Sequence, residues 1–151
     1  MCIRDRVIDA FCGIGNFTLP IAKRVTSVLG LESAEASVQR ARKNAKKNTV
    51  SNALFEVQDL YAKEGVPDLL GYNKMLIDPP RSGAEQLVQS PLIERLERIV
   101  YVSCYPETLA RDAEYLVRRG FRVDAVGLID MFPHTAHLES MALFVREASY
   151  G

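Results

Sequence analysis

The stretch Val7-Ile8-Asp9-Ala10-Phe11-Cys12-Gly13-Ile14-Gly15 decides the fold, because a short apolar run ends in a glycine turn. The run over residues 7–11 has the length of a buried strand, and the two glycines allow the tight backbone turn that follows it. An apolar-periodic segment from about residue 16 to residue 24 then predicts a helix. A strand, a glycine turn and a helix in this order are typical of an α/β unit on a parallel sheet.

Strand and helix signals go on alternating along the rest of the chain. Pro91 must interrupt one of the helices. The further strands are expected at 27–31, 53–58, 74–78, 99–103, 121–130 and 141–146, and the further helices at 34–48, 84–96 and 106–119. We therefore predict an α/β fold with a doubly wound, mostly parallel seven-stranded sheet and an antiparallel closing strand.

Length and composition indicate one soluble globular domain. The chain has 151 residues, of which 48% are apolar and 25% charged. It has neither an apolar run of about 18 residues, as a membrane span needs, nor a secretory signal, so we expect a cytoplasmic protein without a membrane partner. Residues 1–6 carry three charges directly before a buried strand. We expect them to be a non-native or misread start, and residues 7–151 to be one domain, the carboxyl-terminal part of a longer protein.

The balanced charge, with 19 basic and 19 acidic residues, bears on any nucleic-acid substrate. Neutralisation of phosphates supplies most non-specific affinity for nucleic acids, and this chain has no surplus of positive charge. Either its basic groups cluster on one face, or a domain outside these residues holds the substrate.

The cysteines favour one reactive thiol in a reducing compartment. They stand at positions 2, 12 and 104 and form no CxxC pair, which fits neither a disulfide framework nor a zinc or iron–sulfur site. Cys12 lies in the glycine loop, where a small buried residue is the simpler interpretation.

Polar residues at the predicted strand ends indicate a ligand site, because ligands bind outside the carboxyl ends of such strands. The loop has Gly13 and Gly15 but lacks the third glycine of a dinucleotide fingerprint, since Asn16 follows. This favours an amino-acid-like group, such as the methionine moiety of S-adenosylmethionine, over a pyrophosphate. Glu32 is placed to accept ribose hydroxyls, and Asp59 to accept a donor from the adenine edge. Each acid alone could be a solvated loop residue. Because the glycine loop, Glu32 and Asp59 stand at three consecutive predicted strand ends, a shared ligand site is the better interpretation.

The segment Asp78-Pro79-Pro80-Arg81 closes the fourth predicted strand. Its prolines stiffen the turn, so we expect Asp78 to be held beside the cofactor. Enzymes that methylate exocyclic amino groups carry an aromatic ring in the fourth position of related segments. Arg81 stands there instead, which argues against that reaction.

Cys104, in Val102-Ser103-Cys104-Tyr105-Pro106, points to the reaction class. Thiolate addition at C6 of a pyrimidine makes its C5 nucleophilic enough to attack a sulfonium methyl group. The dipole of a helix starting near Pro106 would favour the thiolate form. The alternative is a buried cysteine at a strand end.

A covalent route of this kind needs a base that removes the C5 proton after methyl transfer. The segment 132–139 supplies candidates, and we choose Glu139, just ahead of the last predicted strand. His134 and His137 suggest a metal ion, but their spacing on a proline-bearing loop without a cysteine partner favours loop hydrogen bonds. We therefore expect no metal site.

With these residues, the chain resembles the RNA (uracil-5-)-methyltransferase family, whose members use S-adenosyl-L-methionine. The segments that carry the resemblance are FCGIGNFTLPIA (11–22), Glu32, VQDL (57–60), DPPRSGA (78–84), IVYVSCYPETLARD (99–112) and DMFPHTAHLES (130–140). The resemblance implies a Rossmann-like class I methyltransferase fold, Cys104 as nucleophile and Glu139 as proton acceptor. It implies donor contacts from Phe11, Asn16, Glu32, Asp59 and Asp78, beside the loop glycines Gly13 and Gly15.

The motifs DMFPHT and LARD are most similar to those of family members that act on 23S ribosomal RNA. We therefore expect methylation of a uridine of that RNA, and we expect the protein to be a monomer. The alternatives are a transfer-RNA uridine, an RNA cytosine, a donor-binding fragment without activity and, least favoured, a dehydrogenase.

The sequence departs from the family pattern in two respects. Tyr105 occupies a position where family members usually have Asn, and the upstream RNA-binding regions of the family, some with an iron–sulfur cluster, have no counterpart here.

Overall fold

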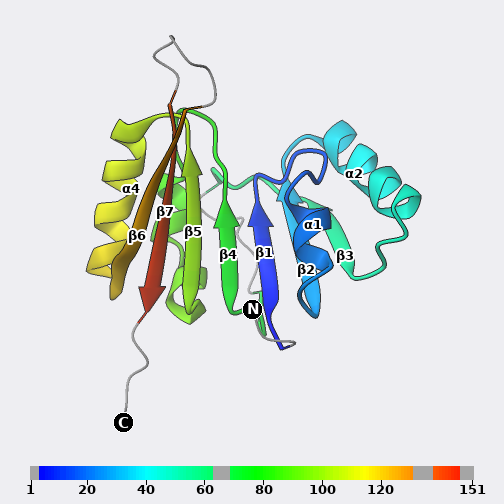
Figure 1. Ribbon diagram of the computed structural model, residues 1–151, viewed down its shortest axis with the longest axis horizontal. Coiled ribbons are helices and arrows are strands. Elements are labelled where there is room, and N and C mark those ends of the chain that lie inside the picture. The colour runs from blue at the N-terminus through cyan, green and yellow to red at the C-terminus, as the bar shows by residue number, and fades with distance from the viewer. Residues whose placement is uncertain (1–3, 63–68, 131–137, 147–151) are drawn as a thin grey trace.

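The computed structural model describes residues 4–62, 69–130 and 138–146, and these form one seven-stranded sheet with helices on both faces (Figure 1). The strands lie in the order β3-β2-β1-β4-β5-β7-β6. Their bounds are β1 Arg6–Ala10, β2 Ser27–Glu32, β3 Ala53–Val57, β4 Lys74–Ile77, β5 Arg98–Ser103, β6 Phe121–Asp130 and β7 Leu138–Arg146. The strands β1 to β5 pair in parallel, and β7 runs antiparallel between β5 and β6, which confirms the predicted fold class.

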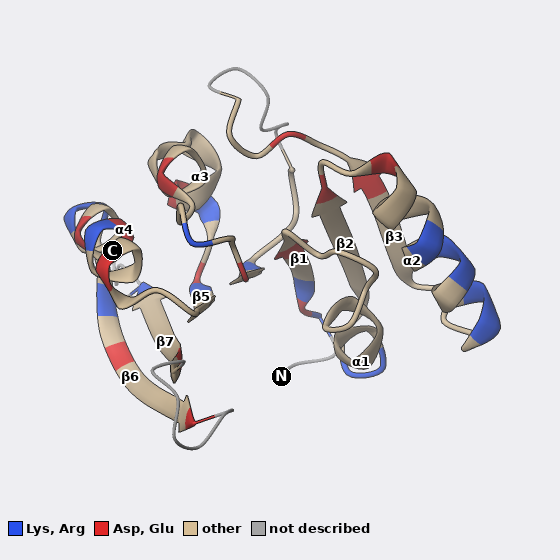
Figure 2. Ribbon diagram, turned by 90° about the horizontal axis from the view of Figure 1, so that it is seen from above, with Lys and Arg blue, Asp and Glu red and all other residues tan. Residues whose placement is uncertain are grey.

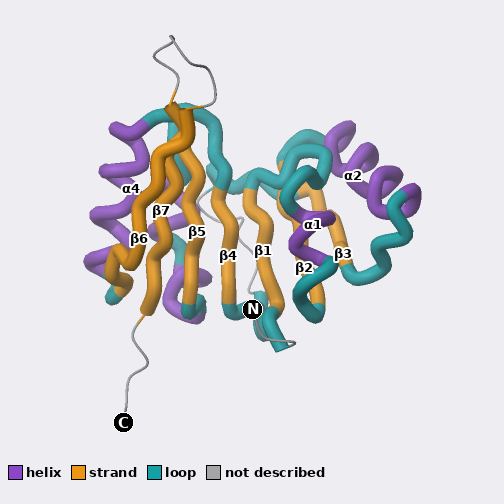
Figure 3. The backbone as a smooth tube through the Cα atoms, in the orientation of Figure 1, coloured by secondary structure: helices purple, strands orange, loops and turns teal. Residues whose placement is uncertain are grey.

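Helices connect the parallel strands, except between β3 and β4, where the described residues form no helix (Figure 3). Their bounds are α1 Thr18–Ala22, α2 Glu35–Lys47, α3 Glu85–Gln89, the 3-10 helix η1 Pro91–Arg95 and α4 Pro106–Arg118. Seen from above the strand ends, α1 lies on one face of the sheet and α3 and α4 on the other (Figure 2). The expected interruption at Pro91 is confirmed, because the chain there leaves α3 and starts η1.

The larger core lies between the sheet and the layer of α3, η1 and α4. It contains side chains of one strand face, such as Ile8, Ile77 and Ile99, packed with Leu87 and Leu116 of the helices. Burial of each such side chain contributes about 1.5–3 kcal/mol, so this face stabilises the sheet and positions the strand ends. A second cluster joins Cys12, Phe55 and the apolar stripe of α2.

Two elements differ most from their predicted bounds; most of the others shift by one residue at an end. The helix after the glycine loop has only five residues, because the chain is still turning through Phe17. Strand β7 begins at Leu138 rather than Met141, since it continues to pair with β6 as far as Asp130. Glu139 therefore belongs to the strand and is not part of the preceding loop.

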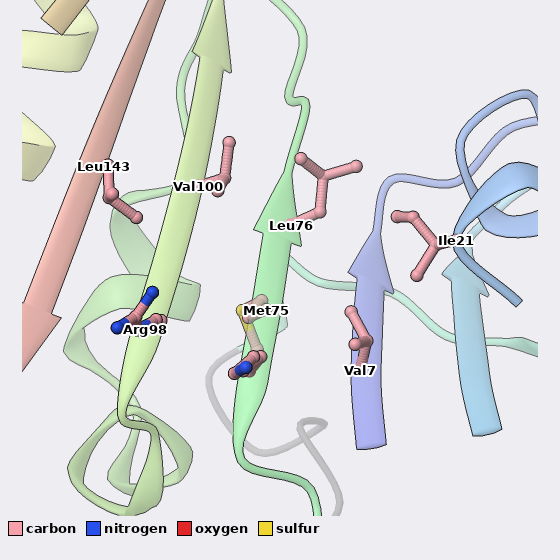
Figure 4. Close-up of a pocket in the computed structure, with 8 residues that line it drawn as sticks. Val7, Ile21, Met75, Leu76, Arg98, Val100 and Leu143 are labelled. Carbon is pink, nitrogen blue, oxygen red and sulfur yellow. The ribbon is translucent and has the colours of Figure 1, made fainter. Parts of the chain in front are cut away.

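The open face of the sheet carries an apolar hollow of about 300 Å³ (Figure 4). Val100, Leu143 and Leu76 line it from three adjacent strands, and Ile21 of α1 closes one side. It lies at mid-strand, away from the strand ends where the candidate site is.

The residues before the first strand are partly described. Asp5 is buried and accepts a hydrogen bond from Lys74 at 2.5 Å, and Arg6 pairs with Ser27 in the ladder of β1 and β2. That residues 1–6 are a non-native or misread start stays a prediction.

Among the described helices, none has the length and apolar character that crossing a membrane requires.

Candidate active site

The candidate site lies where the strand order reverses. Strand β1 pairs with β2 on one side and with β4 on the other, and such a switch point opens a crevice at the carboxyl ends of the strands. The loop after β1 and the segment after β4 border this crevice, and the Asp78 N–H donates to the carbonyl of Ala10 at 3.3 Å. Figure 2, which looks onto these ends, shows acidic residues at the ends of several strands.

The glycine loop has an unusual backbone. Phe11, Gly13 and Gly15 have φ angles of 63°, 54° and 91°, in the left-handed region that glycine adopts at little cost. A Cβ on Gly15 would lie 3.2 Å from the ring of Phe55. The loop therefore turns sharply, packs against Phe55 at Gly15 and has open space at Gly13, where a Cβ would meet nothing within 4 Å.

Glu32, at the end of β2, holds the glycine loop in place. One of its carboxylate oxygens accepts the Gly13 N–H at 3.0 Å, and the other accepts the Ala34 N–H at 3.0 Å. The Ser33 hydroxyl also donates to Glu32, at 3.2 Å. A carboxylate has about four acceptor positions, so Glu32 can still accept a hydrogen bond from a ligand's hydroxyl.

Aromatic residues and Asp59 form the side of the site near β3. Asp59 is exposed, and its carboxylate accepts the Tyr61 N–H at 2.9 Å. The ring of Phe11 lies 5.6 Å from that of Tyr61, centroid to centroid. The Tyr61 hydroxyl lies 2.8 Å from that of Ser82 and donates to the carbonyl of Gly83 at 3.2 Å, which links this side to the segment after β4.

Asn16 lies on the other side of the loop, facing α2. It is exposed and lines a polar hollow of about 300 Å³ together with Asn44 and Asn48. Asn44 supports this part of the loop, because its side-chain amide donates to the carbonyl of Ile14 at 3.0 Å.

Asp9 is a site residue for which the sequence analysis assigned no role. It is 1% exposed, its Oδ2 accepts the Thr18 hydroxyl at 2.5 Å, and within the described part of the chain its Oδ1 has no hydrogen-bond partner. Burial, reinforced by the charge of Asp78, raises the pKa of Asp9 to about 7 against the lowering effect of Thr18. An acid inside an apolar strand run was the sequence signal that could have identified it.

The two described cysteines differ in environment. Cys12 is buried, and burial together with the charges of Asp9 and Glu32 raises its pKa to about 12, so its thiol is not a nucleophile at neutral pH. Cys104 is exposed at the end of β5, directly before the N-cap of α4.

The pairing of β5 with β7 brings the predicted catalytic residues together. Ser103, the last paired residue of β5, lies opposite Ser140 of β7; Cys104 directly follows Ser103, and Glu139 directly precedes Ser140. Strand β4, which Asp78 follows, is the other neighbour of β5. Burial, and then the charge of Glu139, raises the pKa of Asp78 above its ordinary value.

Cys104, Glu139 and Asp78 thus lie at the same edge of the sheet, at the ends of the neighbouring strands β5, β7 and β4. Phe11, Gly13, Glu32 and Asp59 lie at the adjacent strand ends, whereas Gly15 and Asn16 line the hollow toward α2. The segment from Phe132 to His137, with its two histidines, lies outside the described residues. Across the described ranges, no group of three or more His, Cys, Asp and Glu side chains is arranged to hold a metal ion.

Residues 3–147 match the family model described as tRNA (Uracil-5-)-methyltransferase. The chain is 51% identical over 145 residues to a 23S rRNA (uracil(1939)-C(5))-methyltransferase of Xylella fastidiosa, with 94% of this chain and 33% of the relative covered. The identity to the enzyme of the same name from Thiobacillus denitrificans is 54% over 146 residues, covering 94% and 34%. The chain therefore spans about one third of the length of these curated relatives.

Among solved structures, the chain is similar to the tRNA (uracil-54, C5)-methyltransferase of Pyrococcus abyssi, which was crystallised with S-adenosyl-L-homocysteine. The TM-score is 0.77 and the identity 38%, with 93% of this chain and 34% of that chain covered. The chain is also similar to the magnesium protoporphyrin IX methyltransferase of Synechocystis, with a TM-score of 0.74 and 20% identity. The match covers 93% of this chain and 69% of that protein, and it supports the fold alone.

Proposed function

The chain belongs to the tRNA (Uracil-5-)-methyltransferase family, and we propose that it transfers a methyl group from S-adenosyl-L-methionine to C5 of a uridine in RNA. We propose 23S ribosomal RNA as the substrate, because the relatives that are 51% and 54% identical are named for it. As part of this proposal the protein acts in the cytoplasm, as a monomer and without a metal ion at the site.

The observation that carries the proposal is that Cys104 and Glu139 directly adjoin the last residue pair of β5 and β7, at the sheet edge where Asp78 follows β4. An exposed thiol and a carboxylate at this edge supply a nucleophile and a base for one pyrimidine ring. This pair is what C5 alkylation of a pyrimidine requires, since one group must add to the ring and another must remove a proton.

The residues of the crevice fit the methyl donor. Asp9 offers a buried carboxylate oxygen to which no described residue donates, and a Cβ at Gly13 would meet nothing within 4 Å, so a ligand can approach the backbone closely there. Glu32 would accept the ribose hydroxyls and Asp59 the adenine edge, with Phe11, Asn16 and Asp78 completing the contacts. When bound, S-adenosyl-L-methionine supplies an electrophilic methyl group.

The residues of this chain then have defined roles in the reaction. The Cys104 thiolate adds to C6 of the uracil ring, and the resulting enolate makes C5 nucleophilic toward the methyl group. After C5 is methylated, Glu139 accepts the C5 proton. The electron pair released restores the C5–C6 double bond and expels the Cys104 thiolate.

A methylation assay with matched variants tests the proposal. A 23S RNA fragment and methyl-labelled donor should yield 5-methyluridine with the full-length protein. Cys104→Ala should abolish the product while keeping donor affinity within about threefold, because the thiol acts on the ring and not on the donor. Cys12→Ala serves as the control. Normal turnover by Cys104→Ala would rule out the covalent route.

A transfer-RNA uridine is the second candidate substrate, favoured by the 38% identity to the Pyrococcus abyssi enzyme. Parallel assays with 23S RNA and with transfer RNA separate the two, because only one should give product at low enzyme concentration. Formation of 5-methylcytidine would instead favour the cytosine alternative.

A further inference from the structure

The segment after β4, residues 78–84, is held by a buried hydrogen-bond network that starts from α4 and β5. Its central member is Asp112, which is 0% exposed. One oxygen of Asp112, Oδ2, accepts the backbone N–H of Ala84 at 2.6 Å and the hydroxyl of Tyr101 at 2.5 Å. Because Tyr101 belongs to β5 and Ala84 follows the loop, this single atom joins three elements.

Arg111 completes the network on the outer side. Its Nε and Nη2 donate to the other oxygen of Asp112, Oδ1, at 2.9 and 2.8 Å. The same Nη2 donates to the carbonyl of Ser82 at 3.0 Å. All the acceptor capacity shown for Asp112 is directed at these partners, so its buried charge is well compensated.

Thr108 adds a third contact from the same helix. Its hydroxyl lies 3.1 Å from the carbonyl of Arg81 and 3.1 Å from the carbonyl of Tyr105, the residue after Cys104. The first turns of α4 thus hold the backbone of the 78–84 segment at Arg81, Ser82 and Ala84.

Gly83 shows how closely the two parts fit. It has a φ of +78°, and a Cβ there would lie 2.6 Å from Nη2 of Arg111 and 2.7 Å from Oδ2 of Asp112. The backbone of the loop passes directly against the charged pair, leaving no space for a side chain. The contact is therefore a specific fit between this loop and this helix.

The network lies between two residues of the candidate site. Asp78 begins the segment that α4 holds, and Cys104 directly precedes the N-cap of α4. The strands that carry them, β4 and β5, are adjacent and parallel. If the 78–84 loop could move relative to α4, the distance between Asp78 and Cys104 would change.

We propose that Arg111 and Asp112 are positioning residues, which lock the 78–84 loop onto α4 so that Asp78 and Cys104 keep their relative placement during methyl transfer. The inference rests on the function proposed above and deepens it. A displacement of about 1 Å in a reacting group can cost about 100-fold in rate, so a rigid link between these two strand ends has a direct effect on turnover.

Asp112→Asn and Arg111→Lys test the inference in the full-length protein. In Asp112→Asn, the amide NH2 would face groups that donate to Asp112 in the parent protein. In Arg111→Lys, one nitrogen replaces the two that donate to Asp112, so the fork geometry that also reaches Ser82 is lost. The matched control is Glu114→Gln, on the same helix, whose carboxylate pairs with Arg118 and does not contact the loop.

The measurements are the single-turnover methylation rate at saturating donor, per folded molecule and well below the unfolding midpoint, and the affinity for S-adenosylhomocysteine. We expect Asp112→Asn to slow methyl transfer by at least about tenfold and Arg111→Lys by several-fold, with donor affinity within about threefold of the parent. Glu114→Gln should match the parent in both.

The inference would be overturned if both variants kept the parent's methylation rate per folded molecule and only their unfolding midpoints fell. The network would then be purely stabilising. If Asp112→Asn fails to fold, Arg111→Lys alone decides between the two outcomes, because its side chain is partly exposed. An inactive parent protein would overturn the proposed function itself, an outcome distinct from active, rate-insensitive variants.

Discussion

At the scale of single residues, the site depends on carboxylates in three different environments. Glu32 is tied to backbone N–H groups, Asp112 is buried with every oxygen engaged, and Asp9 is buried with one oxygen free. Only the last of these is left without compensation, which is expected of a group that meets a ligand and not of one that holds the fold together.

Asp9 gives a prediction about stability and pH. Its pKa is raised from 3.8 in the unfolded chain to about 7 in the folded protein, so the folded state binds the proton more tightly. Its contribution to the free energy of unfolding is therefore fully present below about pH 4 and is lost as pH rises toward 7, by roughly 4 kcal/mol in all.

Denaturant unfolding of Asp9→Asn and the parent protein, without donor, checks this from pH 4 to pH 8. The two should be close in stability near pH 4, and the variant should become progressively the more stable up to about pH 7, with a constant difference above it. A difference that does not change with pH would show that Asp9 is already charged when buried.

Glu139 gives a prediction about the order of the chemical steps. Glu139→Gln keeps the shape of the side chain but removes the proton acceptor, so C5 should be methylated while the covalent link to Cys104 persists. Turnover should fall by about 10²–10⁴-fold. Denaturing gel electrophoresis of the reaction should show protein linked to methylated RNA, and loss of activity without any such species would contradict the assigned role.

At the scale of elements, the strand ends could be predicted from the sequence because each depends on local patterns. The apolar run before Gly13 and the β-branched run before Cys104 predict β1 and β5 to within a residue. The start of β7 could not be predicted, since Leu138 and Glu139 join the strand only through pairing with Asp130 and Ile129 of β6. The partnership of Asp112 with Ala84 likewise depends on how α4 packs, which no local pattern encodes.

The close packing of the 78–84 loop against α4 leaves no space for a side chain at Gly83. Gly83→Ala would strain a positive φ and force the Cβ against Arg111 and Asp112, so we expect a loss of about 2–4 kcal/mol in the free energy of unfolding. Gly127→Ala on β6 is the control, because a Cβ there meets nothing within 4 Å. Thermal unfolding of both variants measures the difference, and equal midpoints would mean that the loop can move away from the helix.

At the scale of the whole molecule, the described fold is one domain without surplus charge. The 19 basic and 19 acidic residues balance, and Figure 2 shows lysine and arginine positions along α2. The family was predictable from the sequence, because the segments around Gly13, Asp78 and Cys104 are long and distinctive. A nucleic-acid-binding surface was not predictable, since it depends on how separate elements bring their charges together.

Charge balance predicts weak RNA binding by these 151 residues alone. We expect a dissociation constant weaker than about 10⁻⁶ M at physiological salt, and a shallow dependence of log K on log salt concentration. Filter binding of a 23S RNA fragment over a range of salt concentrations, compared with the full-length protein, measures both quantities. Tight binding with a steep salt dependence would show that the basic residues of the domain act together as a phosphate-binding surface.

The most direct test of the central claim is to locate the covalent bond between protein and RNA. RNA carrying 5-fluorouridine at the target position has no C5 proton to lose, so the adduct should accumulate when the donor is present. Mass spectrometry of the digested complex should find the methylated fluorouracil on the peptide that contains Cys104. A stable adduct on any other residue, or methylation of the normal RNA with no trapped adduct on the fluorinated one, would contradict the account.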